Sequence, residues 1–411
     1  MKVCVVGSGG REHALAVVLA RTADVVVTPG NPGIPGSVDT PPGDIDADLY
    51  VIGPEQPLVD GLADQLRGAG KLVFGPGADG AKLEGSKAFM KEVLAAAGVP
   101  TARYADFDDP DEAIAFLDTL PAGPDGGYVI KTDGLAAGKG VLVTTDRAEA
   151  EADIREKLAG ESFGDAGRRV VIEERMVGPE LTVLAVCDGQ RAVALAPSQD
   201  YKRVGDGDAG PNTGGMGCYS PVPAADAGVV QTVLDDFVAP TLAELRRRGI
   251  DFRGVLYAGL MLTPEGPKLV EYNVRFGDPE SQVVLPRLTS DLAQLLAEAA
   301  AGELRSEPTF TDDACVAVAC AAEGYPTSTR TGDVIEGLDR LDDLDGVEVL
   351  FAGVAAGDEP GTLVTAGGRV LYVCGTAPDI DQARALAYQG IARISWPGMH
   401  HRSDIAAVPT T

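Results

Sequence analysis

Three polar residues alternate with apolar ones in the segment KLVEYNVRFGDPE: Glu271, Asn273 and Arg275. Side chains of a β-strand point alternately to its two faces, so a strand here would present all three on one face. A carboxylate and an amide oxygen two residues apart suit Mg²⁺, a hard cation that takes oxygen ligands and usually shares phosphate oxygens with its substrate. Arg275 can then offer a pair of hydrogen bonds to a carboxylate or an acyl phosphate. The segment predicts a metal site beside a reacting anion, and a polar face on an ordinary sheet is the alternative.

A glycine-rich loop lies earlier, in the segment YVIKTDGLAAGKGVLVTT, residues 128–145. It is not a Walker A loop, because that motif requires a glycine at the place of Asp133 and a helix after the loop, whereas a β-rich run follows here. Lys131 lies on the first β-rich run and Lys139 within the loop. We therefore predict a hinged flap whose amides and ammonium groups close over a triphosphate, since a hairpin without a ligand would hardly need both lysines.

The segment VVIEERMVGPELTV, residues 170–183, follows the flap and can complete a nucleotide site. The spacing of Glu173, Met176 and Glu180 allows an acceptor for an exocyclic amine, a backbone contact to a ring nitrogen and a carboxylate for ribose hydroxyls. Adjacent glutamates at a strand end, such as Glu173 and Glu174, are commonly only solvated. The pattern indicates a nucleotide site only because it follows the predicted flap.

The chain opens with VVGSGGREHALA, which resembles a dinucleotide-binding turn. That turn needs Gly-x-Gly-x-x-Gly, and Gly7 and Gly9 fit, but Glu12 stands in place of the third glycine. The acidic residue expected at the end of the next strand is also missing, which disfavours a nicotinamide-dependent oxidoreductase. The free amides of Gly9 and Gly10, with Arg11 and a helix N-terminus, suit a single phosphate instead. A tight turn with a solvated arginine is the alternative.

The segment SQDYKRVGDGDAGPNTGGMGCYSP, residues 198–221, is too long and too glycine-rich for a simple connection. Long loops of this kind are usually functional or disordered, and the Asn-Thr-Gly-Gly-Met-Gly core favours function. Its candidate substrate-binding residues are Asp200, Lys202, Asn212, Thr213 and Gly214.

The elements that must position these residues divide the chain into three regions. In residues 1–100, short β-rich runs alternate with helical patterns, which is typical of a parallel sheet covered by helices. Loops that follow its strands carry Asn31 and Glu55, and open α/β sheets bind ligands at such strand ends. A helix near the end of this region stops at Gly-Val-Pro, which marks a boundary. Residues 101–305 have longer strands and the glycine loops, and residues 306–411 are expected to form a small α+β domain with a mainly architectural role.

Composition limits the classes of function. The net charge of -28, from 34 basic and 62 acidic residues, opposes binding to nucleic acid or anionic membranes. No apolar stretch reaches the ~20 residues that cross a bilayer, and the first residues do not resemble a signal peptide, so we expect a cytoplasmic protein. The six cysteines are scattered without a Cys-x-x-Cys pair and are expected to be reduced core residues.

Taken in order, seven strings resemble the phosphoribosylamine–glycine ligases, also called glycinamide ribonucleotide synthetases, a family of ATP-grasp enzymes of purine synthesis. They are GSGGREHA, PGNPG, GPEQPLV, LEGSKAF, KTDGLAAGKGV, SQDYKRVGDGDAGPNTGGMG and EYNVRFGDPE. The resemblance implies an α/β and α+β multidomain fold: a pre-ATP-grasp domain over 1–100, an ATP-grasp domain over 101–305 with a mobile lid near 120–185, and a C-terminal domain over 306–411. It also implies the reaction, in which the carboxylate of glycine attacks the γ-phosphate of ATP and the amine of 5-phosphoribosylamine then displaces phosphate from glycyl phosphate.

The resemblance further implies roles for individual residues. Arg275, Lys131 and Asn212 would be catalytic, and Glu271 and Asn273 would bind Mg²⁺ or Mn²⁺. The residues implied for ATP are Lys87, Lys131, Gly138, Lys139, Gly140, Glu173, Glu174, Met176 and Glu180. Those implied for the two substrates are Gly9, Gly10, Arg11, Asn31, Glu55, Asp200, Lys202, Asn212, Thr213, Gly214 and Arg275.

The chain departs from the family pattern at two places. It reads Gly178-Pro179-Glu180 where acidic pairs are usual, and Ala406 stands where glycine is expected. Another ATP-grasp ligase or carboxylase of purine synthesis, which activates bicarbonate or formate, remains the alternative activity. The protein is expected to act as a monomer on glycine and 5-phosphoribosylamine.

Overall fold

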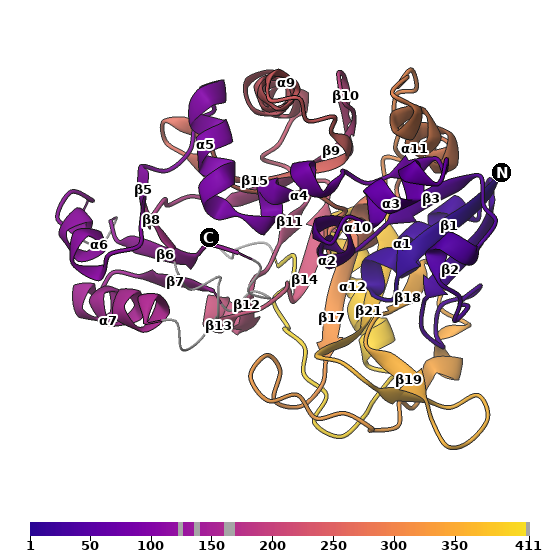
Figure 1. Ribbon diagram of the computed structural model, residues 1–411. Helices are drawn as coiled ribbons and strands as arrows, with labels where there is room; N and C mark the ends of the chain where they lie inside the picture. The colour runs from indigo at the N-terminus through magenta and orange to yellow at the C-terminus, as the bar shows by residue number, and fades with distance from the viewer. Residues whose placement is uncertain (122–125, 135–139, 160–168, 408–411) are drawn as a thin grey trace.

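The computed structural model describes residues 1–121, 126–134, 140–159 and 169–407. Figure 1 shows the N-terminal region in indigo on one side of the molecule and, on the opposite side, a small sheet with the helices α6 (Pro110–Leu117) and α7 (Arg147–Leu158). The C-terminal region, in orange and yellow, lies below the N-terminal region in this view. The predicted α/β and α+β multidomain fold with an N-terminal parallel sheet is confirmed, and the other sheets contain antiparallel pairs.

A parallel sheet forms the N-terminal region, as its alternating pattern predicts. Its strands stand in the order β2-β1-β3-β4, and each neighbouring pair is parallel. The strands are β1 (Lys2–Gly7), β2 (Asp24–Pro29), β3 (Leu49–Ile52) and β4 (Val73–Phe74), and the helices are α1 (Gly10–Leu19), α2 (Glu55–Val59), α3 (Leu62–Gly68) and α4 (Ala78–Gly85). The helix α2 therefore begins at Glu55, directly after β3, at the ligand-binding edge expected for such a sheet.

A sheet of order β5-β8-β6-β7 carries the two sides of the predicted flap. Its strands are β5 (Tyr104–Phe107), β6 (Tyr128–Thr132), β7 (Val141–Thr144) and β8 (Val170–Glu174). The strands β6 and β7 pair antiparallel, with Lys131 opposite Val141. A strand rather than a helix follows the glycine loop, as predicted. Gly138 and Lys139 of that loop lie outside the described residues.

An antiparallel sheet of order β10-β9-β15-β16 follows. Its strands are β9 (Glu180–Asp188), β10 (Ala192–Ala194), β15 (Arg253–Thr263) and β16 (Gly266–Asn273), and the helices of this part of the chain are α5 (Lys87–Ala97), α8 (Ala227–Val233), α9 (Ala239–Arg247), α10 (Ser281–Val284) and α11 (Leu292–Ala301). Because β16 ends at Asn273, Arg275 lies just beyond the strand that was predicted to carry it.

The C-terminal sheet takes strands from the middle of the chain. Its order is β11-β14-β17-β21-β18. The strands β11 (Gln199–Asp200) and β14 (Gly217–Ser220) come from the segment expected to be one long loop, and β12 (Arg203–Gly205) and β13 (Ala209–Asn212) form a hairpin within it. The remaining elements are β17 (Ala314–Ala321), β18 (Val347–Phe351), β19 (Val354–Ala356), β20 (Leu363–Thr365), β21 (Arg369–Ala377) and α12 (Ile380–Ile391). The candidate substrate segment is therefore largely paired, and its end is hydrogen-bonded to β17.

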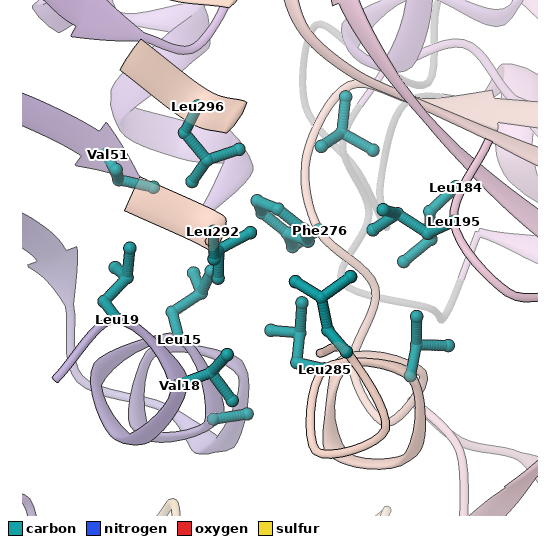
Figure 2. Close-up of a cluster of buried hydrophobic side chains, with 14 of the residues drawn as sticks. Leu15, Val18, Leu19, Val51, Leu184, Leu195, Phe276, Leu285, Leu292 and Leu296 are labelled. Atoms are coloured by element: carbon teal, nitrogen blue, oxygen red, sulfur yellow. The ribbon is translucent and has the colours of Figure 1, made fainter. Parts of the chain in front are cut away.

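Figure 2 shows part of a hydrophobic cluster that is shared by all three regions. It includes Leu15 of α1, Leu184 of β9, Phe276 after β16, and Leu350 and Tyr372 of the C-terminal sheet. Protein interiors are close-packed, so a shared core holds the elements that contribute to it at fixed separations. The loops at the edges of these elements are thereby brought together.

All six cysteines are buried and unpaired, as predicted. Burial raises the pKa of Cys315 and Cys320 to about 12, which keeps both thiols protonated. Among the described residues, none of the helices is both long enough and apolar enough to span a membrane.

Ala406, where the family resemblance leads to an expectation of glycine, has a φ of +54°. Glycine adopts this left-handed conformation freely, whereas a residue with a Cβ atom is disfavoured by roughly 1–2 kcal/mol. The backbone N–H of Ala406 donates to the hydroxyl of Tyr201 at 3.0 Å, which helps to hold the conformation. The expectation of glycine therefore has a conformational basis.

A buried histidine joins α1 to the C-terminal sheet. Nδ1 of His13 accepts a hydrogen bond from the backbone N–H of Phe351 at 2.8 Å, and the two rings stack with centroids 5.8 Å apart. An accepting Nδ1 requires the neutral imidazole. Burial lowers the pKa of His13 to about 4.

Acidification is therefore expected to destabilise the protein through His13. The unfolded residue has a pKa near 6.5, so between pH 6.5 and pH 4 the unfolded chain binds the additional proton and stability falls as the pH falls. The full shift corresponds to about 3 kcal/mol. We expect the melting temperature of the wild type to drop more steeply between pH 7 and pH 4.5 than that of His13→Gln, which keeps an acceptor but does not titrate. Parallel curves for the two proteins would contradict this role.

Candidate functional site

Two buried lysines share one buried carboxylate between α5 and the small sheet. Nζ of Lys131 lies 2.8 Å from Oε1 of Glu173, and Nζ of Lys91 lies 3.2 Å from Oε2 of the same residue. Lys91 also donates to the hydroxyl of Thr101 at 2.8 Å, and Lys131 to the carbonyl of Val270 at 3.3 Å. The three charged side chains are at most 3% exposed. With two ammonium groups and one carboxylate, the cluster carries a net positive charge.

The pKa shifts in this cluster follow from burial and from mutual attraction. Burial would raise the pKa of Glu173, but Lys131 and Lys91 lower it. Burial would lower the pKa of Lys131, but Glu173 and Glu271 raise it. For Lys91 burial outweighs the attraction of Glu173 and lowers the pKa to about 8. At neutral pH Lys131 is therefore charged and Glu173 is ionised.

Lys87, the first residue of α5, reaches the start of the flap. Its Nζ donates to the carbonyl of Gly134 at 3.0 Å. The carboxylate of Asp133 accepts from the hydroxyl of Ser86 at 3.0 Å and from the N–H of Ala88 at 3.2 Å. The beginning of the glycine loop is therefore attached to the N-terminus of α5. Burial lowers the pKa of Lys87, and Glu271 opposes this shift.

The predicted metal ligands lie near the end of β16. Glu271 and Asn273 are both half-buried, and Tyr272 between them is buried, so the expected alternation is present. Among the described residues, neither of the two side chains has a hydrogen-bond partner. An available carboxylate and an available amide oxygen form a donor set that fits a hard divalent cation. The charge of Glu271 also acts on Lys87 and Lys131, which ties this position to the lysines.

Lys202 connects the start of β9 to the candidate substrate segment. Its Nζ pairs with Glu180 and, at 2.8 Å, with Oδ1 of Asp200. The N–H and the hydroxyl of Thr213 both donate to the carbonyl of Lys202, at 2.7 and 2.8 Å. Burial would lower the pKa of Lys202, but the two carboxylates raise it well above its usual value. Lys202 therefore links Glu180, which is predicted to bind the ribose hydroxyls, to the candidate substrate segment.

Glu55 brings together two arginines that are far apart in the sequence. Its Oε2 lies 3.3 Å from Nη1 of Arg11 and 3.1 Å from Nε of Arg275. Arg275 also pairs with Glu84 at 3.1 Å and donates to the carbonyl of Phe276 at 3.2 Å. Burial would raise the pKa of Glu55, but Arg275 and Arg11 lower it to about 2. The N-terminal glycine loop and the residues that follow β16 therefore meet at this carboxylate.

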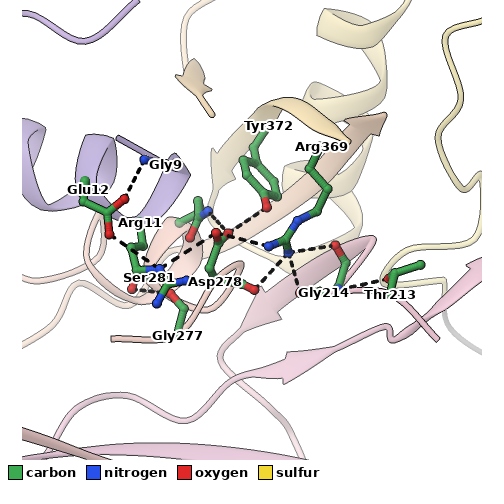
Figure 3. Close-up of polar contacts among 12 residues, drawn as sticks. Gly9, Arg11, Glu12, Thr213, Gly214, Gly277, Asp278, Ser281, Arg369 and Tyr372 are labelled. Atoms are coloured by element: carbon green, nitrogen blue, oxygen red, sulfur yellow. Dashed lines mark hydrogen bonds and ion pairs between the residues drawn. The ribbon is translucent and has the colours of Figure 1, made fainter. Parts of the chain in front are cut away.

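The N-terminal glycine loop is partly filled by Glu12. Oε2 of Glu12 accepts the N–H of Gly9 at 2.6 Å, which is the half of a capping box that a glycine at the N-cap of α1 still permits (Figure 3). Arg11 lies 3.6 Å from Glu12 and 3.9 Å from Asp278, in addition to its pair with Glu55. The prediction of a free amide is therefore wrong for Gly9, because the residue at the third glycine position folds back to cap the helix. A phosphate bound here would have to replace some of these contacts.

Asp278 accepts hydrogen bonds from the C-terminal sheet and from α10 (Figure 3). Its Oδ1 accepts from the hydroxyl of Tyr372 and from Nε2 of Gln282, both at 2.7 Å, and its Oδ2 accepts from Nη2 of Arg369 at 3.2 Å. Burial would raise the pKa of Asp278, but Arg369 and Arg11 lower it. Arg369 also donates to the carbonyl of Gly214 in the candidate substrate segment.

The other predicted site residues lie around these clusters. Glu174 accepts the N–H of Arg103 at 3.0 Å, and Met176 is half-buried between β8 and β9. Asn212 ends β13. The carbonyl of Gly140 accepts a hydrogen bond from the backbone N–H of Thr132. Nδ2 of Asn31 donates to the carbonyls of Ser8 and Ala352, at 2.8 and 3.0 Å. Asn31 therefore attaches its loop to the C-terminal region.

The sequence reasoning missed five members of these clusters, namely Glu84, Lys91, Asp278, Arg369 and Tyr372. Glu84 and Asp278 stand inside strings already singled out, LEGSKAF and EYNVRFGDPE, and Lys91 is one of only ten lysines. These signals could have drawn attention to the three. Arg369 and Tyr372 stand in an apolar run that carries no such signal.

Known proteins resemble the chain along almost its whole length. Family models described as the N domain, the ATP-grasp (A) domain and the C domain of phosphoribosylglycinamide synthetase match residues 1–84, 85–281 and 315–408. A phosphoribosylamine–glycine ligase of Streptomyces coelicolor is 48% identical over 427 residues, which cover 99% of either chain.

Solved structures agree with this result. A crystal structure of phosphoribosylamine–glycine ligase from Thermotoga maritima has a TM-score of 0.84 and 34% identity, and the match covers 98% of this chain and 100% of that one. The biotin carboxylase domain of a Hydrogenobacter thermophilus 2-oxoglutarate carboxylase, solved with MgADP and bicarbonate, shares the fold with a TM-score of 0.70 at 16% identity over 97% of this chain and 91% of that one. The chain belongs to the phosphoribosylglycinamide synthetase family of ATP-grasp proteins.

Proposed function

We propose that the protein is a phosphoribosylamine–glycine ligase of purine biosynthesis. It joins glycine to 5-phosphoribosylamine through glycyl phosphate and produces glycinamide ribonucleotide, ADP and phosphate. The observation that carries the proposal is the junction at Glu55, where Arg11 and Arg275 share one carboxylate. An amine held beside the N-terminal loop can attack an acyl phosphate only if the two binding regions are adjacent, and this junction supports such an arrangement.

The nucleotide side of the reaction depends on fixed positive charge. Lys131 and Lys87 would neutralise the triphosphate, and fixed charges aimed at a transferring phosphoryl group stabilise its transition state. Glu271 and Asn273 would hold Mg²⁺ or Mn²⁺, which when bound would neutralise phosphate oxygens. Glu180 would accept hydrogen bonds from the ribose hydroxyls after its ion pair with Lys202 has opened. Burial of the lysine cluster excludes water and strengthens these interactions.

The substrate side depends on Arg275 and on the segment that contains Asn212 to Gly214. Arg275 would hold the carboxylate of glycine and then the acyl phosphate with two parallel hydrogen bonds. The carboxylate of glycine has no good leaving group, so phosphorylation first creates one. The amine of phosphoribosylamine then attacks the carbonyl carbon, and phosphate leaves.

The experiment that tests the proposal is an ADP-release assay with substrates omitted in turn. We expect ADP release with ATP and Mg²⁺ to require glycine and phosphoribosylamine together, or to be greatly accelerated by the pair. Equal turnover with formate or bicarbonate and the matching amine would favour another ATP-grasp ligase instead. Titration with NAD(P)H is the control for the oxidoreductase alternative.

Arg11→Ala is expected to raise the KM for phosphoribosylamine about tenfold or more and to leave the KM values for ATP and glycine nearly unchanged. The reason is the loss of a charge-assisted contact, typically worth ~1.5 to 3 kcal/mol, on the side of the site that faces the N-terminal loop. Steady-state kinetics with each substrate varied in turn provide the measurement. An equal rise in the KM for ATP would show that Arg11 does not act specifically on phosphoribosylamine. Unaltered KM values with a lower melting temperature would show that Arg11 stabilises the fold and does not bind this substrate.

We further propose that the enzyme works in the cytoplasm as a monomer. The excess of acidic residues and the reduced, buried cysteines support this assignment. Light scattering of the purified chain tests the oligomeric state.

A further inference from the structure

Arg369 extends from the C-terminal sheet to the candidate substrate segment (Figure 3). It is the first residue of β21, and its side chain is 16% exposed. Its Nη1 donates to the carbonyl of Gly214, to that of Gly215 at 3.2 Å and to that of Asp278 at 3.0 Å, while Nη2 lies 3.2 Å from Oδ2 of Asp278. One guanidinium therefore holds two segments that the sequence separates by more than sixty residues.

Gly214 leaves the space that this guanidinium occupies, and Gly215 leaves space for the neighbouring Pro279. A Cβ atom on Gly214 would lie 2.8 Å from Cζ and from Nη2 of Arg369. Gly215 has a φ of +109°, and a Cβ atom there would collide with Pro279. A side chain at either position would displace Arg369 or the Asp278–Pro279 turn. Gly214 is therefore matched to Arg369, and Gly215 to the Asp278–Pro279 turn that Arg369 also binds.

The same guanidinium orients the carboxylate of Asp278 relative to the N-terminal loop. Tyr372, on the same strand as Arg369, donates its hydroxyl to Asp278 at 2.7 Å. Oδ2 of Asp278, the oxygen bound by Arg369, lies 3.9 Å from Nε of Arg11. A continuous chain of contacts thus runs from Gly214 through Arg369 and Asp278 to Arg11.

We propose that Arg369 is a positioning residue for the ligase reaction. It fixes the carbonyls of Gly214 and Gly215 and the carboxylate of Asp278, and so sets the separation between the candidate substrate segment and the N-terminal loop proposed to receive phosphoribosylamine. The inference rests on the proposed function. It gives the C-terminal region a part in substrate binding, beyond the architectural role expected from the sequence.

The test is the kinetics of Arg369→Met, which keeps an unbranched side chain over Tyr372 and removes all the N–H donors. We expect the KM values for glycine and phosphoribosylamine to rise about tenfold or more, and the KM for ATP to change less than about twofold. Circular dichroism and the melting temperature establish that the variant is folded. Arg369→Lys provides a second variant: it keeps a charge near Asp278 but cannot hold the carbonyls as well, so an intermediate effect is expected.

Arg384→Met is the matched control. Arg384 also belongs to the C-terminal region, donates to the carbonyls of Ser403 and Ile405 at 2.6 and 2.9 Å, and lies over the ring of Tyr388 at 4.8 Å. Its loss is expected to lower the melting temperature and to leave all KM values unchanged.

Chemical rescue separates positioning from general stability. Millimolar guanidinium added to Arg369→Ala is expected to lower the KM values for glycine and phosphoribosylamine again, and to have no such effect on Arg384→Ala. The inference is overturned if Arg369→Met keeps wild-type KM values, or if all three KM values rise together. Absence of glycine-dependent ADP release from the wild type would instead overturn the proposed function, so the two failures are distinguishable.

Discussion

Lys131→Met is expected to lower kcat about a hundredfold, which corresponds to ~3 kcal/mol of lost transition-state stabilisation. Lys131 is buried and held by Glu173 and by the carbonyl of Val270, so its charge is fixed before the nucleotide binds. Such a charge needs no reorganisation when the γ-phosphoryl group transfers. Single-turnover measurement of ADP formation, with the KM for ATP determined in parallel, provides the test.

The fold is expected to survive this substitution because Glu173 keeps Lys91 at 3.2 Å as a partner. Lys157→Met is the matched control, since Lys157 is also buried and ion-paired, with Asp153 on α7 of the same part of the chain. The control is expected to lose stability but to keep its kcat. Wild-type turnover in folded Lys131→Met would remove Lys131 from the reaction.

Arg275→Lys is expected to lower kcat by a similar factor, about a hundredfold, despite the retained charge. Arg275 spans Glu55 and Glu84, both at 3.1 Å, and donates to the carbonyl of Phe276 at 3.2 Å. Burial would lower its pKa, but Glu84 and Glu55 raise it, so the guanidinium is charged throughout the accessible pH range. A single ammonium cannot bridge two carboxylates and also present a planar fork to an acyl phosphate.

The control for this substitution is Arg287→Lys. Arg287 is buried and donates to the carbonyls of Asp313 and Thr311 and to the hydroxyl of Ser220 at the end of the candidate substrate segment, and none of these three is a predicted site residue. Its replacement is expected to lower the melting temperature without lowering the kcat of the folded protein. If Arg275→Lys behaves in the same way, Arg275 stabilises the fold and does not hold the reacting group.

Local features of the fold could be predicted because they depend on neighbouring residues. The helix α5 begins where the hydroxyl of Ser86 accepts the N–H of Phe89 at 3.1 Å, and it ends at Gly98 with a φ of +69°. Glu271 and Asn273 share a strand face because alternation is a property of any strand. The flap could likewise be distinguished from a Walker A loop, since the residues that follow it are β-rich.

The sequence by itself therefore determined the parallel sheet, the strands on either side of the glycine loop, the shared strand face of Glu271 and Asn273, and the family resemblance. Only the tertiary structure decided which charges are paired: Lys91 with Glu173, Glu55 with both Arg11 and Arg275, and Arg369 with Asp278. The physical reason is that backbone geometry sets short-range spacing, whereas a pairing between distant residues depends on how whole sheets pack. The shared core around Phe276 and Leu15 holds the three regions together, and no local pattern encodes which side chains then face one another.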